Sequence, residues 1–397
     1  MAVYTKSAMQ RLSESSDDME LWWDSSPLIF EAWAKKMVEK APAEEKDELD
    51  RQLKILFDVH NPAETLFCGV TTNPRLTKKV LDLIPDEVNP IIDEIIKGNP
   101  VKSNYQLAWK VYKAITEKGA KLYMPLFEKS KYKLGYVSAQ VDPRLVTDVR
   151  EMLRQALELK KLSPNIILKC PVSKEGIYLI QILTSIGIPT NSTLVFHVPA
   201  AIQVAKAVKR GHEIGSLWGV DYSQWRSVIT IMIGRFEERP EFAESAKSVG
   251  IELNEELKRW AGIAIAKKAH NLINDPKNGY KSKLLLCSAR PGPGEGNIYH
   301  LEKVAGGNLV YTMNPELIDD FLKICKTKDI YSQIDEPVPA DIMEKLAKIP
   351  FFKAGYEEDG IAIEDFINHP SFVYTRDEFS GSMKDIEDYV VERKKKL

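Results

Sequence analysis

The sequence predicts a (β/α)8 barrel, and three observations support this fold class. Short apolar runs alternate with longer amphipathic stretches along most of the chain, which is the pattern of repeated βα units around a parallel sheet. Eight such runs are present. A chain of 397 residues with 44% hydrophobic content is also long enough for one large barrel or for two ordinary domains.

The apolar runs have the length of strands and are bounded by polar residues. We expect strands at Leu21–Asp24, Leu66–Val70, Leu134–Gln140, Ile166–Lys169, Thr193–Phe196, Val228–Ile233, Leu284–Cys287 and Leu309–Met313. The alternative fold, a doubly wound sheet, would place a glycine-rich turn after its first strand. That turn is Asp24-Ser-Ser-Pro27 and contains no glycine, so the barrel is favoured.

The stretches between the strands have apolar residues at helical spacing, and several begin with proline or an acidic first turn. We expect helices at Pro143–Leu159, Lys174–Ile186, Pro199–Lys209, Asn254–Ile273 and Pro315–Ile324. The long interval between the second and third strands has room for two or three more. No strand is expected after Ile324. We therefore expect a barrel over residues 1–330 and a helical C-terminal extension, residues 331–397, packed on it.

Charge and composition exclude several function classes. The 55 Lys and Arg residues balance 57 Asp and Glu residues, and neither half is basic, so neither nucleic acid nor a membrane is an expected partner. The N-terminal residues are polar, and no apolar run reaches the roughly 18 residues of a membrane span. We expect a soluble, cytoplasmic protein that acts on a small molecule. A homodimer is the candidate assembly, although the sequence leaves the oligomeric state open.

Cysteine and histidine spacing gives no sign of disulfides or metal. The four cysteines are Cys68, Cys170, Cys287 and Cys325; they are far apart and form no C-x-x-C pair, as expected of reduced thiols in the cytosol. The six histidines show no metal-ligand spacing. We therefore expect no metal and no cofactor.

One lysine, Lys169, ends an otherwise apolar run within Asn165-Ile-Ile-Leu-Lys-Cys-Pro171. A strand buried on both faces tolerates almost no charge, so the ammonium must either reach water or take part in chemistry. Desolvation lowers the pKa of a lysine and frees its amine to attack a carbonyl. Lys169 is therefore a candidate Schiff-base former. The structural alternative is that its side chain extends from the end of the strand into solvent.

Polar residues also stand at the ends of the other predicted strands. In a barrel, the C-terminal strand ends form the active site. Seven consecutive strands supply hydrogen-bonding or charged side chains there: Asp24, Asn73, Gln140, Lys169, Asn191 and Thr193, Thr230 and Arg235, and Ser288 and Arg290. We expect these residues to share one site.

These groups suit aldol chemistry on a sugar. The Lys169 amine can attack a ketone, a carboxylate such as Asp24 can move protons, and the amides and hydroxyls can hold sugar hydroxyls. Arg235 and Arg290 provide forked donors for a phosphate. Arg290 also precedes a glycine-rich run, Pro291-Gly-Pro-Gly-Glu-Gly296, whose spacing matches no standard phosphate loop and is a weak signal.

Several motifs resemble those of the transaldolase family. They are Gly69-Val-Thr-Thr-Asn-Pro74, the segment Asn165–Pro171 followed by Glu175-Gly-Ile177, Gly187-Ile188, Asn191-Ser-Thr-Leu-Val-Phe196, Gly234-Arg235 and Ser288-Ala-Arg290. Their order and spacing match over roughly residues 20 to 325. The tail, with Gly355-Tyr356 and Asp359-Gly360, is similar to that of the longer plant- and actinobacterial-like members.

The resemblance implies a barrel enzyme that moves a dihydroxyacetone unit from a ketose phosphate to an aldose, as in the pentose phosphate pathway. It implies that Lys169 forms the Schiff base and that Asp24 is the acid/base on the C4 hydroxyl. It implies that Asn73 and Asn191 bind the dihydroxyacetone moiety, that Thr193 holds the catalytic water and that Thr230 contacts the sugar. It implies that the phosphate is bound by Arg235, Ser288 and Arg290.

Gln140 departs from the family pattern, because most transaldolases have a glutamate there that works with the bound water. A neutral amide cannot accept a proton. The related fructose-6-phosphate aldolases also have glutamine, but they pair it with a tyrosine where this chain has Met232. His197 stands where a serine is usual and either carries protons or packs; packing is favoured. Glu175 is best interpreted as a first-turn residue of its helix.

Three functions remain open. A transferase of the transaldolase type is the leading hypothesis. The close alternative is a lyase that releases free dihydroxyacetone, or a specialised biosynthetic relative with another acceptor. A barrel that only binds a sugar phosphate is the third, and the retained Lys169, Asp24, Asn73 and Asn191 argue against it.

Overall fold

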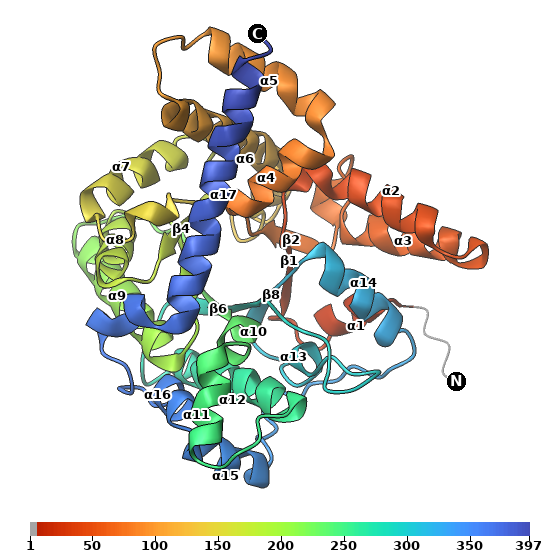
Figure 1. The fold of residues 1–397 in the computed structure, drawn as a ribbon, viewed down its shortest axis with the longest axis vertical. Coiled ribbons are helices and arrows are strands. Elements are labelled where there is room, and N and C mark those ends of the chain that lie inside the picture. The colour runs from red at the N-terminus through yellow and green to blue at the C-terminus, as the bar shows by residue number, and fades with distance from the viewer. Residues whose placement is uncertain (1–5) are drawn as a thin grey trace. The chain divides into compact units, whose positions relative to one another are not determined.

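The computed structural model describes residues 6–397, and its central feature is a closed barrel of eight strands in sequence order (Figure 1). The strands are β1 (Glu20–Trp23), β2 (Phe67–Val70), β3 (Tyr136–Gln140), β4 (Ile166–Pro171), β5 (Thr190–Val195), β6 (Ser227–Met232), β7 (Ser282–Cys287) and β8 (Leu309–Met313). The pairings β2–β3, β3–β4, β5–β6, β6–β7 and β7–β8 are parallel. The predicted fold class is confirmed.

Every predicted strand is present, and the differences lie at the ends. Strand β5 begins at Thr190, three residues before the predicted start. Its first residues are polar but fully buried, so an apolar pattern could not reveal them. Strand β3 begins at Tyr136 because Gly135, at φ 80°, turns the chain just before it.

The predicted helices are also present, with one split and one extension. The stretch predicted as a single helix from Pro143 is a 3-10 turn, η4 (Pro143–Leu145), followed by α7 (Val149–Lys160). The Asp148 side chain accepts from the backbone N–H of Glu151 and so starts a new helix. Helix α9 (Val198–Leu217) continues past the predicted end. The others are α8 (Lys174–Ser185), α12 (Glu255–Asn274) and α14 (Pro315–Ile324).

Three helices fill the interval between β2 and β3: α4 (Pro74–Leu83), α5 (Pro85–Lys97) and α6 (Asn104–Lys129). Between β1 and β2 lies a helical hairpin of α2 (Phe30–Lys40) and α3 (Lys46–Leu56). Within residues 6–397, no helix is long and apolar enough to cross a membrane.

Internal contacts divide the chain into two compact units. The smaller unit comprises Trp22–Lys169 and Thr375–Leu397. The larger unit comprises Cys170–Tyr374 and the N-terminal residues up to Leu21. The strands of both units are almost wholly buried, and they contribute both apolar and polar buried side chains.

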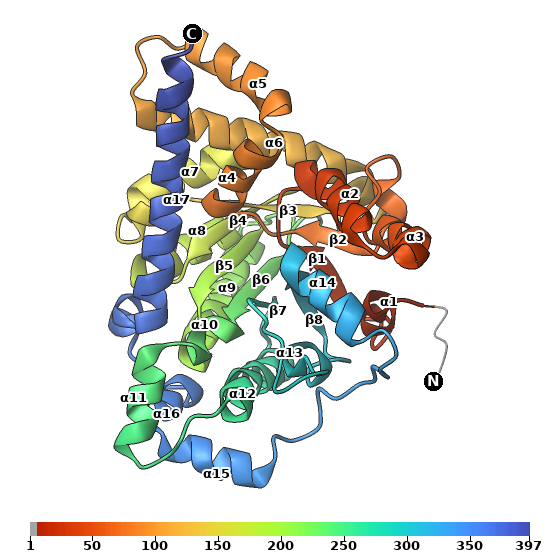
Figure 2. The same cartoon turned by 45° about the vertical axis from the view of Figure 1, so that its right-hand side comes forward.

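The tail is helical, as expected, with α15 (Ala340–Lys348), α16 (Pro350–Tyr356), η5 (Ile363–Asn368) and α17 (Pro370–Lys394) (Figure 2). In the smaller unit, the later part of α17 is held by polar contacts to η4, α4 and α5. These are Arg75–Glu378, Arg144–Glu387, Asn89–Tyr389 and Asp93–Arg393. The domain boundary at residue 330 stays a prediction.

Candidate active site

Lys169 lies inside strand β4, which continues two residues beyond it to Pro171. The side chain is 2% exposed, so the solvent alternative is excluded. Its Nζ lies 3.5 Å from the carbonyl oxygen of Thr72. The register places Lys169 opposite Gln140 of β3. Burial raises the pKa of the neighbouring Cys170 thiol far above its usual range, so this thiol stays protonated and unreactive.

Asp24 follows strand β1 directly and is held by the start of the loop after β2. The Thr71 hydroxyl donates to Asp24 Oδ1 at 2.7 Å, and the Thr71 backbone N–H donates to the carbonyl of Trp23 at 2.9 Å. These two hydrogen bonds fix the position and orientation of the Asp24 carboxyl group. The two strands therefore present an oriented Asp24 at their C-terminal ends.

Asn73 has a structural role that sequence reasoning did not identify. Its Oδ1 accepts from the backbone N–H of Leu76 at 3.0 Å, so Asn73 is the N-cap of α4, with Pro74 at the first helical position. The cap fixes the rotamer of a buried amide next to β2. Capping and ligand binding are compatible, because the cap uses only the carbonyl side of the amide.

Gln140 is buried at the end of β3. Its backbone N–H donates to the hydroxyl of Tyr112 at 2.7 Å. Its side-chain Oε1 has no protein hydrogen-bond partner among residues 6–397. A buried amide oxygen without a partner costs free energy, so a polar partner at this position would be bound favourably.

In the larger unit, β5 and β6 bring Asn191, Thr193 and Thr230 to the same strand pair. Thr230 donates to Asn191 Oδ1 at 2.6 Å, and both side chains are buried. The Thr193 hydroxyl is buried without a partner in the described part of the chain. These strands thus position one amide and present one unsatisfied hydroxyl.

The backbone around Thr193 is irregular, which the sequence did not indicate. The β5–β6 register shifts between Ser192 and Val195, and Leu194 has φ 61°. A leucine in the left-handed region is strained, and such strain concentrates at functional sites. The bulge changes the direction of the strand directly after Thr193.

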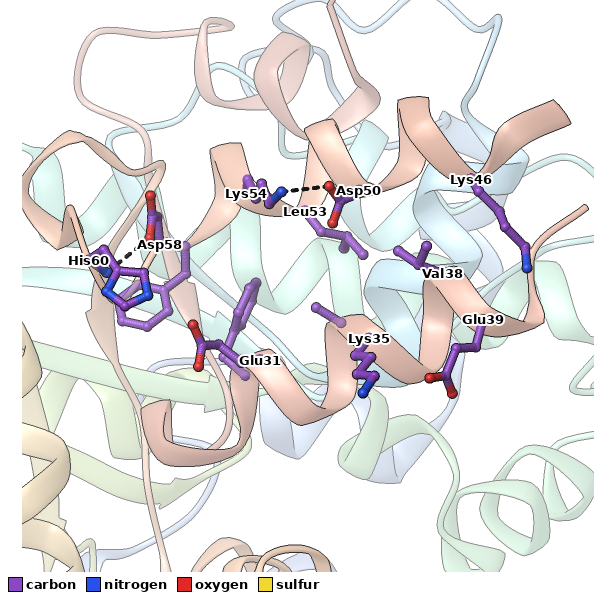
Figure 3. A pocket seen from close by; sticks show the side chains of 13 residues that line it. Glu31, Lys35, Val38, Glu39, Lys46, Asp50, Leu53, Lys54, Asp58 and His60 are labelled. Atoms are coloured by element: carbon purple, nitrogen blue, oxygen red, sulfur yellow. Dashed lines mark hydrogen bonds and ion pairs between the residues drawn. The ribbon is translucent and has the colours of Figure 1, made fainter. Parts of the chain in front are cut away.

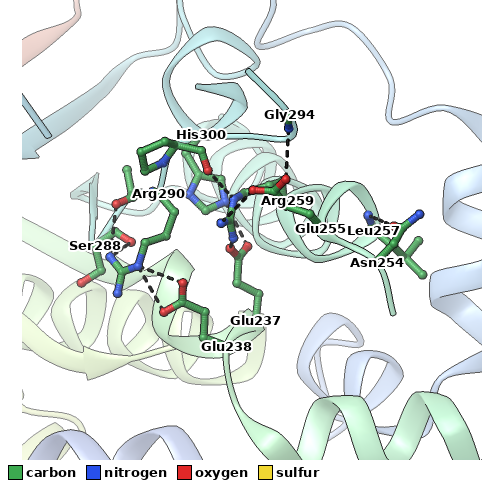
Figure 4. Close-up of polar contacts among 12 residues, drawn as sticks. Glu237, Glu238, Asn254, Glu255, Leu257, Arg259, Ser288, Arg290, Gly294 and His300 are labelled. Carbon is green, nitrogen blue, oxygen red and sulfur yellow. Dashed lines mark hydrogen bonds and ion pairs between the residues drawn. The ribbon is translucent and has the colours of Figure 1, made fainter. Parts of the chain in front are cut away.

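Arg290 and Ser288 follow strand β7 (Figure 4). Ser288 itself has φ 58°, so a predicted site residue also lies in the left-handed region. Arg290 donates from Nε to both oxygens of Glu238, at 3.0 and 3.1 Å, and from Nη1 to the carbonyls of Ser288 and Ala289. Sequence reasoning missed Glu238, which stands three residues after Arg235.

A buried network behind Arg290 was also missed. The Arg290 backbone N–H donates to His300 Nδ1 at 3.0 Å, and His300 Nε2 lies 3.0 Å from Glu237. Because Nδ1 accepts, Nε2 must hold the proton and donate to the carboxylate. Glu237 also pairs with Arg259. No sequence motif indicates this network. A weak signal is Glu237 itself, because a glutamate is unusual in a buried segment such as Ile233–Glu237.

Arg235 lies in the short helix α10 (Ile233–Glu237), directly after β6. Its guanidinium lies 6.0 Å from the ring of Tyr374, and its carbonyl accepts from the Ser371 hydroxyl. Residues Met232 and Cys287 are partners in the β6–β7 register, so Arg235 and Arg290 follow the same ends of two paired strands. This placement brings the two predicted phosphate ligands to neighbouring strand ends.

The glycine-rich run, residues 291–296, contacts Glu255 of the same chain. The backbone N–H of Gly294 donates to Glu255 at 3.0 Å. A Cβ at Gly292 would lie 2.2 Å from an oxygen of Glu255. Packing against this carboxylate therefore explains Gly292 without a phosphate, whereas Gly294 and Gly296 have open space around them and positive φ angles.

His197 is a packing residue. Its Nδ1 accepts from the backbone N–H of Ala200, which caps α9, and its ring packs on Phe366 and His369. Burial, and secondarily the nearby His369, hold the pKa of His197 well below its usual range, so the ring is neutral. Glu175 lies in the first turn of α8, behind the N-cap Ser173. Both observations agree with the interpretations that the sequence favoured.

A separate cavity of about 540 Å³ lies between α2 and α3 (Figure 3). Its apolar lining includes Phe30, Val38 and Leu53, with charged residues such as Lys35 and Glu39 at its rim. None of the predicted site residues lines it. Among residues 6–397, no group of three or more potential metal ligands is present.

The comparisons with known proteins decide the family. The family model described as Transaldolase/Fructose-6-phosphate aldolase matches residues 50–366. The chain belongs to this family. It is 26% identical over 260 residues to a transaldolase of Helicobacter pylori, covering 64% of this chain and 73% of that protein. It is 30% identical over 232 residues to a transaldolase of Thiobacillus denitrificans, covering 58% of this chain and 63% of that protein.

A transaldolase of Trichodesmium erythraeum is 25% identical over 304 residues, covering 70% of this chain and 77% of that protein. The family resemblance inferred from the motifs is thereby confirmed, and the chain is a member of an enzyme family of sugar-phosphate aldolases and transferases. The family description joins two activities, so membership alone does not choose between transfer and cleavage.

Proposed function

We propose that the protein is a Schiff-base-forming transferase that moves a dihydroxyacetone unit from a ketose phosphate to an aldose acceptor. The donor is of the fructose 6-phosphate or sedoheptulose 7-phosphate type. The observation that supports this most strongly is the burial of Lys169 inside β4. A lysine amine kept from water is a nucleophile toward a ketone, and no metal or organic cofactor is needed for that reaction.

The proposed reaction begins when the Lys169 amine adds to the ketone carbon and water is lost, which gives an iminium ion. Asp24 takes the proton of the C4 hydroxyl, the C3–C4 bond breaks, and the shortened aldose leaves. The electron pair of that bond stays on the lysine-bound fragment as an enamine. Addition of the enamine to an acceptor aldehyde, followed by hydrolysis, releases the new ketose and restores the amine.

The remaining predicted residues would bind the sugar. Asn73 and Asn191 are proposed ligands of the dihydroxyacetone moiety, and Thr230 supports this role by orienting the Asn191 amide. Thr193 is the proposed holder of the water that hydrolyses the iminium ion, and its unsatisfied buried hydroxyl is suited to that partner. All of these residues are polar and buried, which is the composition of a preorganised sugar site.

Arg235, Ser288 and Arg290 are the proposed phosphate ligands. The positive φ of Ser288 and the backbone hydrogen bond from Arg290 to His300 support this role, because they fix the loop after β7 in one conformation. Glu237 then acts as a positioning residue through His300. Preorganised donors bind an anion without a further cost in conformational entropy.

One observation favours a second candidate, a lyase that releases free dihydroxyacetone. Gln140 replaces the carboxylate that would help protons move to and from the water, and its Oε1 has no protein partner among the described residues. The related fructose-6-phosphate aldolases, which favour cleavage over transfer, also have a glutamine at this position. The choice between the two functions therefore depends on the fate of the enamine.

The deciding experiment follows products from fructose 6-phosphate with and without erythrose 4-phosphate. A transferase forms sedoheptulose 7-phosphate only when the acceptor is present and releases little dihydroxyacetone without it. A lyase releases dihydroxyacetone in both reactions. Binding of the sugar phosphate with neither product would contradict both proposals and leave a silent binding barrel.

A further inference from the structure

Arg239 follows the proposed phosphate ligand Arg235 by four residues and has no assigned role. It stands between α10 and α11 (Pro240–Ser248), where it is the N-cap residue of α11. Its guanidinium lies 3.9 Å from the centre of the Tyr374 ring, and that of Arg235 lies 6.0 Å from the same centre. At most the sum of these two distances can separate the two guanidinium groups. Arg239 therefore belongs to the surroundings of Arg235.

Packing on Tyr374 explains the position of Arg239 but not its hydrogen-bonding groups. A guanidinium stacked on an aromatic ring uses its flat face and leaves its N–H donors pointing outward along its edge. Arg239 Nε is buried and has no hydrogen-bond partner among residues 6–397, and the side chain does not cap α11. A buried donor without a partner costs free energy, so an acceptor such as an anion would be bound favourably there.

The donors of Arg290, by contrast, are largely used by the protein itself (Figure 4). Its Nε donates to both oxygens of Glu238, and its Nη1 donates to two backbone carbonyls. A Cβ at Gly234 would lie 3.4 Å from Arg290 Cζ, so this guanidinium packs beside the residue that precedes Arg235. Arg290 is thus held at a short segment, residues 234–239, that contributes two further arginines and the carboxylate of Glu238.

The charges of this segment show what Arg239 adds. Arg235 and Arg290 bring two positive charges, and Glu238, which pairs with Arg290, cancels one of them. The other carboxylate of the segment, Glu237, is already paired in the protein interior. A phosphate monoester carries close to two negative charges at neutral pH. The two arginines predicted from sequence therefore balance only half of that charge, and Arg239 supplies the second net positive charge.

We propose that Arg239 is a specificity-determining residue of the phosphate site, and that it selects a doubly ionised phosphate over singly charged anions. This role rests on the proposed function, in which Arg235 and Arg290 bind the phosphate of the donor. A phosphate monoester is accepted at this site, whereas a carboxylate or a phosphodiester binds weakly. Coulombic attraction scales with the charge of the ligand, so the free energy that Arg239 contributes is about twice as large for a dianion.

The test compares two probes that differ in charge and have no carbonyl group with which a lysine could react. At pH 8 methyl phosphate is a dianion, whereas dimethyl phosphate can lose only one proton and is a monoanion. Phosphorus NMR titration of the full chain measures a Kd for each probe. We expect the wild type to bind methyl phosphate at least about tenfold tighter than dimethyl phosphate. Arg239→Met should weaken methyl phosphate about tenfold and dimethyl phosphate only about threefold.

A double variant separates the charge of Arg239 from its packing. Glu238→Gln combined with Arg239→Met restores the net positive charge, so the Kd of methyl phosphate should return to within about threefold of the wild-type value. A lost packing contact with Tyr374 would not be repaired in this way. Lys247→Met on α11 is the matched control, because it removes one exposed positive charge from the neighbouring helix. This control should bind both probes as the wild type does.

Arg239→Gln makes the same charge change and keeps a planar group for stacking on Tyr374, so the role of Arg239 stays testable if Arg239→Met does not fold. Equal Kd values for the two probes in the wild type, or a double variant that does not recover, would overturn the proposal. If Arg290→Ala loses methyl phosphate and the Arg239 variants do not, the phosphate site stands without Arg239. If none of these variants changes the Kd, the proposed phosphate site itself is wrong.

Discussion

At the scale of single residues, Gln140 has the greatest influence on which reaction the site supports. In the proposed mechanism no carboxylate stands at residue 140, so the proton transfers that form and hydrolyse the Schiff base would fall to Asp24 or to water, since His197 is neutral and packed. General acid/base assistance is typically worth about 10² to 10⁴ in rate. The wild type should therefore be slow on ordinary pentose phosphate sugars.

Gln140→Glu should raise transfer from fructose 6-phosphate to erythrose 4-phosphate by about tenfold or more, because a carboxylate can accept and return the proton of the hydrolytic water, whereas an amide cannot. Initial rates of both proteins measure the effect. A wild-type rate already at about 10 s⁻¹, together with a slower Gln140→Glu variant, would show that glutamine belongs to the mechanism.

A second residue-scale prediction concerns Glu238, which holds the Arg290 guanidinium in an ion pair. A phosphate that binds Arg290 must approach this carboxylate. Glu238→Gln should therefore lower the KM for fructose 6-phosphate about threefold or more. Its turnover of an unphosphorylated donor should not change. The threefold figure is modest because the pair is partly exposed and solvent screens it.

Arg290→Ala is the companion variant. It should cost roughly 2–4 kcal/mol of transition-state binding for phosphorylated donors, since a charge-assisted contact is lost. Equal effects of these two substitutions on phosphorylated and unphosphorylated donors would argue against a phosphate at Arg290.

At the scale of elements, the ends of strands are where the sequence was least informative. The core of each strand follows from its apolar run, and all eight strands were predicted. The start of β5 was missed because the buried residues Thr190 to Ser192 are polar, and the bulge at Leu194 leaves no trace in the residue pattern. Local periodicity reports burial, whereas such details are set by neighbouring strands.

The same limit explains the missed partners of the predicted site. Arg290 could be chosen from sequence because it follows a strand. Glu238 and His300 could not, because their contacts with Arg290 join the end of α10, the segment after β7 and the short helix α13 (Tyr299–Glu302). The dual role of Asn73 as N-cap was recognisable in principle from the Asn73-Pro74 pair at a helix start.

An element-scale prediction concerns Glu20 at the start of β1. Burial alone would raise the pKa of Glu20, but Arg226 and Lys283 lower it to about 2. A carboxyl group with a depressed pKa in the folded state stabilises the protein above its unfolded pKa, and this contribution is lost as the pH falls toward 2. The contribution is about 3 kcal/mol at neutral pH.

Glu20→Gln should therefore lower the free energy of unfolding at pH 7 by about that amount or more, since two cations lose their partner. The difference between variant and wild type should shrink between about pH 5 and pH 2. Urea unfolding across this pH range measures it. A difference that does not change with pH would exclude the ion pair as its cause.

At the scale of the whole molecule, fold and family were accessible from sequence because they rest on repeated features. Eight apolar runs define the barrel, and several ordered motifs define the family. Surface properties were not accessible in this way. The exposed apolar side chains of α8, such as Tyr178 and Ile182, became apparent only from the structure, because an apolar residue at either position is equally consistent with a buried face.

The central claim for the whole enzyme is covalent catalysis by Lys169. Burial lowers the pKa of two other lysines, Lys160 and Lys267, to about 8, so their amines are chemically plausible competitors of Lys169. Each donates to backbone carbonyls of the surrounding structure. They provide matched controls for the lysine that strand β4 buries.

The most direct measurement is borohydride reduction of the protein with fructose 6-phosphate, followed by intact mass and peptide mapping. We predict one reduced three-carbon adduct, located at Lys169, in the wild type and in Lys160→Met and Lys267→Met. Lys169→Ala should give no adduct and should retain less than about one part in a thousand of the turnover. An adduct on Lys160 or Lys267, or a Lys169→Ala variant that still traps substrate, would contradict the account.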